Sequence, residues 1–116
     1  MIYLASPYSG TQEEMQSRYL ETERATAYWL SQGKIIYSPI VHCHELARKY
    51  SLPTDFLFWQ HYNRGMLRLA SELWIFKLPG WTESNGVTAE VNFAQQLDIE
   101  IMTLDPASNV VRKLVS

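Results

Sequence analysis

Short apolar runs alternate with longer amphipathic stretches along the chain, which predicts strands and helices in turn. Four short runs rich in β-branched and aromatic residues, each bounded by turn residues, predict strands at residues 2–5, 34–38, 72–77 and 100–104. Helical spacing predicts helices over residues 12–32, 56–70 and 87–97, with shorter pieces ending at Tyr50 and spanning 110–115. We therefore expect an α/β fold: one Rossmann- or flavodoxin-like domain whose open parallel sheet of four to five strands carries helices on both faces.

The two longest predicted helices each have one face that should be buried. On the first, the three- and four-residue spacings select Met15, Tyr19, Thr22, Thr26, Trp29 and Leu30. On the helix from Phe56 the same spacing selects Phe56, Trp59, Asn63, Met66, Leu67 and Ala70. Asn63 is the polar member of this second, otherwise apolar face, so we expect it to point inward near the ligand-binding edge of the sheet.

Composition and charge narrow the class of protein. With 116 residues, 47% of them hydrophobic and 19% charged, the chain fits one globular domain over residues 1–116. No apolar run approaches the roughly 18 residues of a membrane span, and the first residues resemble a strand rather than a signal peptide, so we expect a cytoplasmic protein without a membrane partner. A net charge of −2 gives no basic surface for a nucleic-acid polymer, and the single cysteine, Cys43, has no disulfide partner within the chain.

The segment from Leu73 to Gly86, LWIFKLPGWTESNG, is expected to organise the chemistry. It predicts a strand, a Pro-Gly turn and a polar loop that leads into a helix, which is half of a βαβ unit. Ligands of open α/β sheets bind at the carboxyl ends of the strands. The site should therefore lie in loop 78–86 and in the first helical turn after it, where we place Glu90.

Two other groups of residues are candidates for substrate contacts. His42 and His44 would share one side of an extended segment, but their surroundings lack the ligand spacing of a zinc site, so no metal is expected. They suit contacts to a base or sugar, and surface or capping histidines are the alternative. Trp81, in the predicted loop, could stack on a base, although aromatic residues near Pro-Gly turns more often belong to the core.

Three stretches together resemble the nucleoside 2-deoxyribosyltransferase-like superfamily, in particular its small bacterial and phage branch. They are YLASPYSG at the start, YSPIVHCHE after the second strand, and LPGWTESNGVTAE before the last long helix. The resemblance extends from Met1 to about Asp105, and its most specific part pairs the tyrosine of the first strand with Ser84, Gly86 and Glu90. It implies cleavage or exchange of an N-glycosidic bond, without a cofactor, in a nucleoside or nucleotide.

The resemblance also assigns roles. It makes Glu90 the nucleophile on the anomeric carbon and Tyr3 its hydrogen-bond partner. A carboxylate in a first helical turn is expected to stay ionised, as a retaining mechanism requires. A serine at position 84, with Ser6, Ser9 and Gly10, implies a phosphate cradle and hence a 5′-monophosphate substrate. Each assignment has an alternative. Glu90 could only offset the helix dipole, Tyr3 could be an ordinary buried aromatic residue of a strand, and the serines and Gly10 could form ordinary helix caps and turns.

One residue departs from the family pattern. Asn63 stands where the family usually has an aspartate that helps protonate the departing base, and an amide cannot supply a proton. We hypothesise that Asn63 instead hydrogen-bonds the base; Asp55 or His61 could replace the missing acid, or the substrate's base could leave without it. The alternatives to an enzyme are a nucleotide-binding module or sensor on the same fold, and a flavodoxin-like flavin-binding domain.

The resemblance implies a homodimer or larger homo-oligomer as well. The apolar faces of the two long helices, rich in Tyr28, Trp29, Phe58 and Trp59, would form a symmetric interface.

Overall fold

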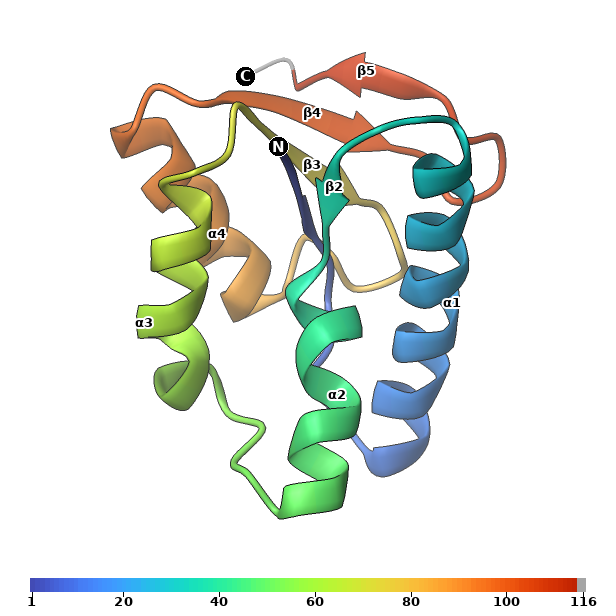
Figure 1. Cartoon of the computed structure of the whole chain (residues 1–116), viewed down its shortest axis with the longest axis vertical. Helices are drawn as coiled ribbons and strands as arrows, with labels where there is room; N and C mark the ends of the chain where they lie inside the picture. The colour runs from blue at the N-terminus through green and yellow to red at the C-terminus, as the bar shows by residue number, and fades with distance from the viewer. Residues whose placement is uncertain (115–116) are drawn as a thin grey trace.

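Five strands and four helices follow one another in the computed structural model, which describes residues 1–114. The elements are β1 (Ile2–Ala5), α1 (Gln12–Ser31), β2 (Ile36–Tyr37), α2 (Pro39–Tyr50), α3 (Phe56–Leu67), β3 (Glu72–Phe76), α4 (Asn85–Gln96), β4 (Glu100–Leu104) and β5 (Val111–Lys113). The sheet has the order β2-β1-β3-β4-β5, with the first four strands parallel and β5 antiparallel to β4. The predicted single-domain α/β fold with an open, mainly parallel sheet is confirmed. In Figure 1, α1 lies on one side of the sheet and α3 and α4 lie on the other.

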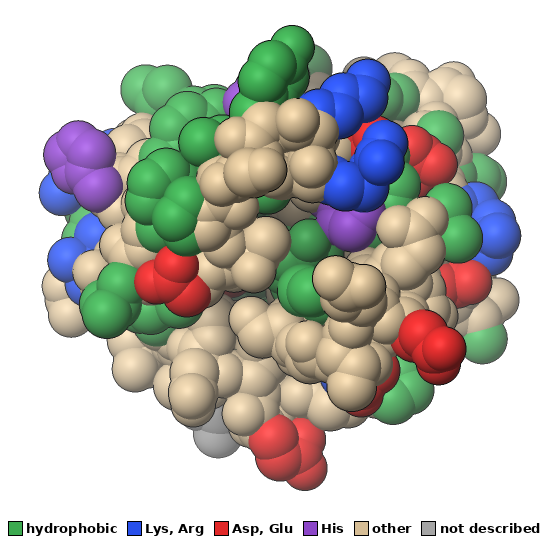
Figure 2. Space-filling view, turned by 90° about the horizontal axis from the view of Figure 1, so that it is seen from below, with side chains coloured by type: hydrophobic (Ala, Val, Ile, Leu, Met, Phe, Trp, Pro, Cys, Tyr) green, Lys and Arg blue, Asp and Glu red, His purple; other side chains and the backbone are tan. Residues whose placement is uncertain are grey.

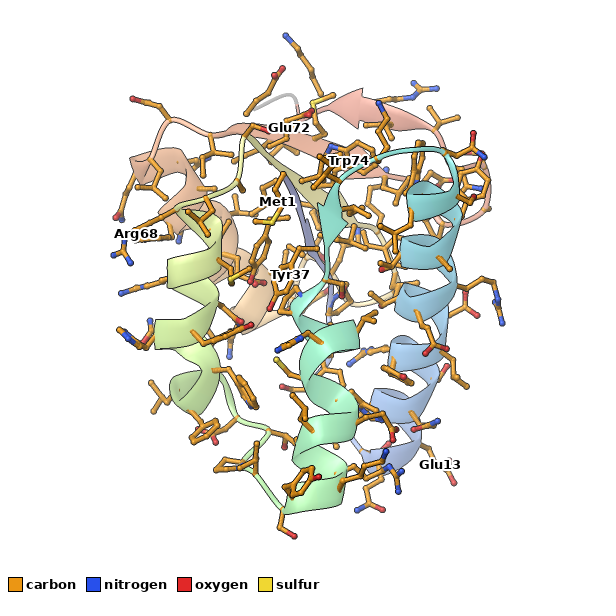
Figure 3. All side chains as sticks on the ribbon, in the orientation of Figure 1. Met1, Glu13, Tyr37, Arg68, Glu72 and Trp74 are labelled. Carbon is orange, nitrogen blue, oxygen red and sulfur yellow. The ribbon has the colours of Figure 1, made fainter. Side chains whose placement is uncertain are left out.

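Alternation along β1 divides its side chains between the two faces of the sheet. Ile2 and Leu4 join the core under α1, whereas Tyr3 and Ala5 join the core under α3 and α4. The residues of β3 alternate in the same way, and side chains fill the space on both sides of the sheet (Figure 3). The chain leaves β1 toward one face and leaves β3 toward the other. These neighbouring strands therefore form the switch point at which α/β proteins of this strand order bind ligands.

Local signals in the sequence set most of the helix ends. Thr11 and Glu14 form a capping box at the start of α1, and Gly33, at φ +82°, follows its end. The hydroxyl of Ser38 accepts a hydrogen bond from the backbone N–H of Val41, and Pro39 occupies the first position of α2. That pair of signals explains why α2 begins directly after β2, rather than after an extended segment over residues 40–45.

The expectation of a helix over residues 110–115 is wrong. The Asp105 side chain accepts hydrogen bonds from the backbone N–H and hydroxyl of Ser108, and Asn109 takes a left-handed φ of 57°, so the chain reverses after β4. The returning segment forms β5 and completes the backbone hydrogen bonds of the sheet edge. Residue 115 of the predicted helix lies outside the described residues.

Smaller differences concern boundaries and one side chain. The second strand is shorter than expected, α3 ends at Leu67 rather than Ala70, and α4 runs from Asn85 to Gln96 rather than from Val87 to Leu97. Leu30 was expected to face the sheet but is 54% exposed, because in the last turn of α1 it is Trp29 that packs against the core, and the next residue turns toward solvent. Within residues 1–114, no helix combines the length and the apolar character that crossing a membrane requires.

Candidate functional site

A cavity of about 470 Å³ lies at the carboxyl ends of β1, β2 and β3. This volume falls within the roughly 300–1,000 Å³ of small-molecule sites. Figure 2 shows the molecule from below, where the surface is hollowed near its centre and a histidine side chain lies beside basic side chains. The lining comes from the loops after these strands and from α1, α2, α3 and α4. It includes Ser6, Pro7, Tyr8, Ser9, Arg18, Pro39, Ile40, Cys43, His44, Thr54, Asp55, Phe56, Trp59, Asn63, Gly80, Glu83, Ser84, Asn85, Gly86 and Glu90.

Glu90 is a buried carboxyl group in the wall of this cavity. It is 9% exposed, and its Oε2 atom accepts a hydrogen bond from the hydroxyl of Tyr3, which is fully buried. The two side chains meet because alternation along β1 directs Tyr3 to the face that α4 covers. The hydrogen bond leaves the carboxyl group in contact with the cavity while fixing its orientation.

Burial, rather than the start of α4, dominates the acidity of Glu90. Because Ser84 caps α4 and Asn85 is its first residue, Glu90 lies in the second turn and not in the first as expected. Desolvation raises the pKa of Glu90 to about 7, although the hydrogen bond from Tyr3 opposes the shift. The expectation that the helix N-terminus keeps Glu90 fully ionised is therefore wrong for the unliganded protein near neutral pH.

The loop after β1 forms one end of the cavity and is held by Arg18. The Arg18 guanidinium donates hydrogen bonds to the carbonyl oxygens of Ser9, at 2.7 Å, and Tyr8, at 3.4 Å. Its Nη2 atom would lie 3.2 Å from a Cβ added at Gly80, whose φ of +91° also favours glycine. Arg18 thus brings positive charge to the place where the β1–α1 and β3–α4 loops meet.

The start of α4 faces the same end of the cavity. The Ser84 hydroxyl accepts a hydrogen bond from the backbone N–H of Val87, so Ser84 is a helix cap, as the alternative to phosphate binding predicted. Ser84 also lines the cavity with Asn85 and Gly86. Helix N-termini with free N–H groups bind anions. Together with Arg18, this end of the cavity is suited to a negatively charged group.

Two buried polar atoms in the lining have no hydrogen-bond partner among the described residues. They are the Ser6 hydroxyl oxygen and Oδ1 of Asn63. Buried polar atoms are normally hydrogen-bonded. These atoms therefore mark two places where a bound polar molecule can be held, one in the β1–α1 loop and one on α3, and the inward orientation expected of Asn63 is confirmed.

The wall that α3 forms is largely aromatic. Phe56 and Trp59 line the cavity, and the indole N–H of Trp59 donates to the carbonyl oxygen of Pro53 at 2.7 Å. Asp55 also lines it, but its carboxylate accepts the backbone N–H of Phe58 as the cap of the helix. His61 is exposed and lies outside the lining, so it is not placed to replace the acid that Asn63 lacks.

The two candidate histidines do not share one side of the chain, as an extended segment would have required. Both belong to α2, where residues two apart point in different directions. His44 is buried in the cavity wall, whereas His42 is exposed and stacks on Tyr62 at a centroid distance of 5.6 Å. The cap at Ser38 and the proline after it were the signals that could have predicted this helix.

Two other predicted contacts also lie outside the cavity lining. Trp81 packs against the core under α3 and α4, in keeping with the alternative that such aromatic residues belong to the core. Gly10 lies against the capping box of α1, where an added Cβ would come within 2.8 Å of Glu14. Tyr8 does line the cavity but was not predicted to do so, although it lies between Ser6 and Ser9 in the loop that was predicted to bind phosphate.

Residues 1–114 contain no group of three or more His, Cys, Asp or Glu side chains arranged to hold a metal ion. Cys43 lies in the cavity wall as a free, buried thiol, and burial raises its pKa to about 11. The thiol is therefore protonated near neutral pH.

The fold and the cavity define an α/β protein with a buried carboxyl group at the switch point of a β2-β1-β3-β4-β5 sheet. Comparison with family models shows that the chain belongs to the family described as Domain of unknown function (DUF1937), which matches residues 1–105. No curated protein matches the chain. The matched range ends just after β4, so it contains every residue of the cavity lining.

Proposed function

We propose that the protein is an N-glycosidase that cleaves the bond between base and sugar in a (deoxy)nucleoside 5′-monophosphate, or carries out the related deoxyribosyl transfer, with Glu90 as the nucleophile. The observation that carries the proposal is the buried Glu90 carboxyl, held by Tyr3, in the wall of a nucleotide-sized cavity. The resemblance to the nucleoside 2-deoxyribosyltransferase-like superfamily supports the same roles. We place the activity in the cytoplasm, where nucleotides are available.

The chemistry uses Glu90 in its ionised form. One carboxylate oxygen accepts the Tyr3 hydrogen bond, and the other attacks the anomeric carbon as the base departs. An oxocarbenium-like centre carries positive charge, so a bound substrate favours the ionised carboxylate that burial alone disfavours. Water then releases the sugar from Glu90, or a second base takes it in a transfer reaction.

The ends of the cavity suit the two ends of such a substrate. Arg18, the hydroxyls of Ser6 and Ser9, and the start of α4 provide positive charge and donors for a phosphate. Phe56 and Trp59 provide apolar surface for a base. Oδ1 of Asn63 can accept a hydrogen bond from the base, in line with the hypothesis that this residue recognises the base rather than protonating it.

The first test is release of free base from a panel of ribo- and deoxynucleoside 5′-monophosphates and the matching unphosphorylated nucleosides. We expect release from monophosphates and little or none from free nucleosides, measured by chromatography of the products. Addition of a second free base would reveal transfer as a new nucleotide. Release from no compound in the panel would contradict the proposed activity.

Substitutions at Ser84 separate its role as a helix cap from contact with phosphate. Ser84→Ala should lower the free energy of unfolding by about 1 kcal/mol through loss of the cap. Ser84→Asp keeps a good cap but adds a negative charge. Near a protein surface this charge repels a phosphate by more than about 1 kcal/mol, so kcat/KM for monophosphates should fall at least ten-fold. Chemical denaturation and kcat/KM provide the two readouts. Unchanged kcat/KM in the stable Ser84→Asp variant would leave only the capping role.

A nucleotide-binding module is the second candidate function, and Asn63 favours it because an amide cannot act as a general acid. Calorimetric titration of the same panel would then detect binding without turnover. Flavin mononucleotide belongs in this titration, because the strand order is that of flavodoxin-like proteins.

We also propose a homodimer or larger homo-oligomer. Tyr28 and Phe58 are 42% and 47% exposed and remain available for an interface. Trp29, which was expected to contribute, packs edge to face on Trp74 in the interior, and Trp59 belongs to the cavity wall.

A further inference from the structure

The proposed reaction needs a proton for the departing base, and the usual sources in this cavity are unsuitable. Asn63 has no acidic proton. Burial raises the pKa of both the Cys43 thiol, to about 11, and the Tyr8 hydroxyl, but only Tyr8 has a hydrogen-bonded partner among the described residues that can assist its ionisation. Asp55 is occupied as the cap of α3, and Glu83 accepts a hydrogen bond from the Thr82 hydroxyl; both are exposed to solvent. Another group in the cavity wall must therefore donate the proton if the base leaves in neutral form.

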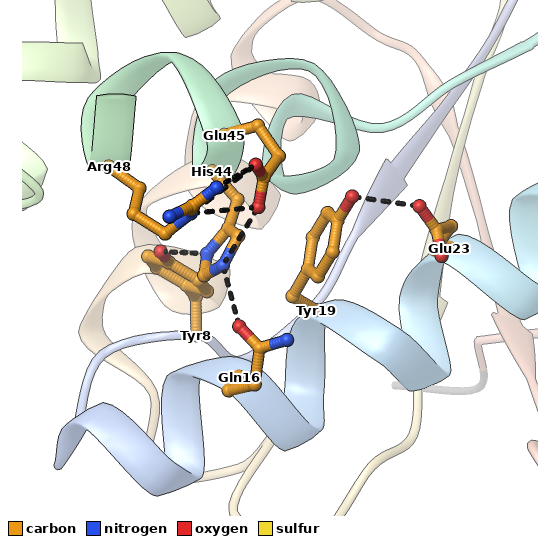
Figure 4. A network of polar contacts seen from close by, with 7 residues as sticks. All are labelled: Tyr8, Gln16, Tyr19, Glu23, His44, Glu45 and Arg48. Carbon is orange, nitrogen blue, oxygen red and sulfur yellow. Dashed lines mark hydrogen bonds and ion pairs between the residues drawn. The ribbon is translucent and has the colours of Figure 1, made fainter. Parts of the chain in front are cut away.

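Tyr8 and His44 form a hydrogen-bonded pair in that wall. The Tyr8 hydroxyl oxygen lies 2.6 Å from Nδ1 of His44, and Nε2 of His44 lies 3.0 Å from Oε1 of Gln16 (Figure 4). Because the Gln16 oxygen can only accept, Nε2 carries a proton and Nδ1 of the neutral ring accepts the Tyr8 hydroxyl. The Tyr19 ring, stacked on His44 at 4.1 Å, fixes the imidazole plane.

The pair also connects the cavity with a second hollow on the outer side of α1 and α2. Tyr8 and His44 line both, whereas Glu90 lines only the inner cavity and Gln16 only the outer hollow. The pair therefore lies between the substrate cavity and a second, solvent-facing hollow.

We infer that Tyr8 is the general acid for the departing base and that His44 is the positioning residue that supplies its proton. This inference rests on the proposed glycosidase function. In the active form the imidazolium donates its Nδ1–H to the Tyr8 oxygen, which turns the Tyr8 O–H toward the base.

The step balances without an oxidant or cofactor. The bond between the anomeric carbon and the base nitrogen breaks and its electron pair stays on the base, which takes the Tyr8 proton. A carboxylate oxygen of Glu90 forms the new bond to carbon, and the Nδ1 proton of His44 moves to Tyr8. Water then attacks the same carbon, the bond to Glu90 breaks with its pair returning to the carboxylate, and the proton of the water passes through Tyr8 to His44.

Charged and titratable groups around His44 set how readily it holds that proton. Burial lowers the pKa of His44, the Glu45 carboxylate opposes this shift, and Arg48 adds to it. Glu45 Oε1 lies 4.0 Å from His44 Nε2, but Glu45 also pairs with Arg48 at 2.8 Å. The groups that face the ring from its own helix, from α1 and from the loop after β1 are Glu45, Arg48, Tyr19, Glu23 and Tyr8.

The test compares two substrates with the same sugar phosphate. One carries a natural base that the panel identifies, and the other carries 4-nitrophenol, which leaves as a stable anion and needs no proton. We expect Tyr8→Phe and His44→Gln to lower kcat/KM, which reports the steps up to departure of the leaving group, by roughly 10²- to 10⁴-fold on the natural substrate, the usual contribution of general acid catalysis. On the nitrophenyl compound kcat/KM should change little, because that leaving group needs no proton. Tyr50→Phe is the matched control, because this tyrosine at the end of α2 is exposed and lies outside both linings, and we expect it to leave the rates on both substrates unchanged.

The pH profile gives a second, independent readout. The native protein needs an ionised Glu90 and a protonated His44, so its kcat/KM should be bell-shaped. In Tyr8→Phe the fall at high pH should disappear, leaving activity that rises through about pH 7, the pKa of Glu90, to a plateau. Equal losses of kcat/KM on both substrates, or an unchanged kcat/KM for Tyr8→Phe on the natural substrate, would overturn the roles of Tyr8 and His44. The activity of the native protein would still support the glycosidase. Absence of native activity on both substrates would overturn both.

Discussion

Replacing Glu90 by alanine is expected to lower base release by roughly 10⁴-fold or more, the scale on which removing a catalytic nucleophile acts. The carboxyl group is buried, oriented by the Tyr3 hydroxyl and in contact with the cavity, so no exposed carboxylate of the lining can take its position. The measurement is kcat for the best monophosphate of the panel, with circular dichroism to show that the variant is folded.

Added formate distinguishes a nucleophile from a group that only stabilises charge. In Glu90→Ala the truncated side chain leaves room for a formate ion on the same side of the sugar, where it can attack the anomeric carbon and restore part of the rate. Glu90→Gln fills that room with an amide, so formate should have no effect on it. A Glu90→Ala variant with native activity would show that another group attacks, and equal effects of formate on both variants would contradict attack from the position of Glu90.

The parts of the site that could be predicted from sequence depend on short-range geometry. The period of two along β1 places Tyr3 on one face, and the cap at Ser84 sets the rotation of α4 that brings Glu90 toward it. Both relations hold within a single strand or helix. The family resemblance therefore predicted that Tyr3 and Glu90 meet, although Glu90 was placed one turn too early and the catalytic roles remain proposals.

The parts that were missed depend on contacts between distant segments. Tyr8 and His44 are 36 residues apart, and their meeting depends on how α2 packs against α1. The start of α2 at Pro39 also decides that His44 rather than His42 reaches the cavity. Similarly, β5 forms because the open edge of β4 offers backbone hydrogen bonds, whereas the local pattern of residues 110–115 resembles a weak helix.

The same buried carboxyl group that serves the proposed chemistry should destabilise the fold at high pH. Glu90 has a pKa of about 7 in the folded protein, against an ordinary value of 4.5. Between these two values the folded state binds a proton that the unfolded state has released, so the free energy of unfolding falls as pH rises through this range. A difference of about 2.5 pKa units corresponds to about 3 kcal/mol lost by pH 8.

Glu90→Gln should therefore be more stable than the native protein by about 3 kcal/mol at pH 8, and the difference should shrink toward zero below pH 5. The glutamine oxygen can still accept the Tyr3 hydrogen bond, so the variant removes the buried charge without leaving the phenol unpaired. Urea denaturation at several pH values, followed by tryptophan fluorescence, measures the free energy of unfolding. Glu83→Gln, which neutralises an exposed carboxylate of the same cavity, should stay within about 0.5 kcal/mol of the native protein throughout. A gap between Glu90→Gln and the native protein that does not change with pH would contradict a buried, titrating Glu90, because a neutral substitution that merely improved packing would stabilise the fold equally at every pH.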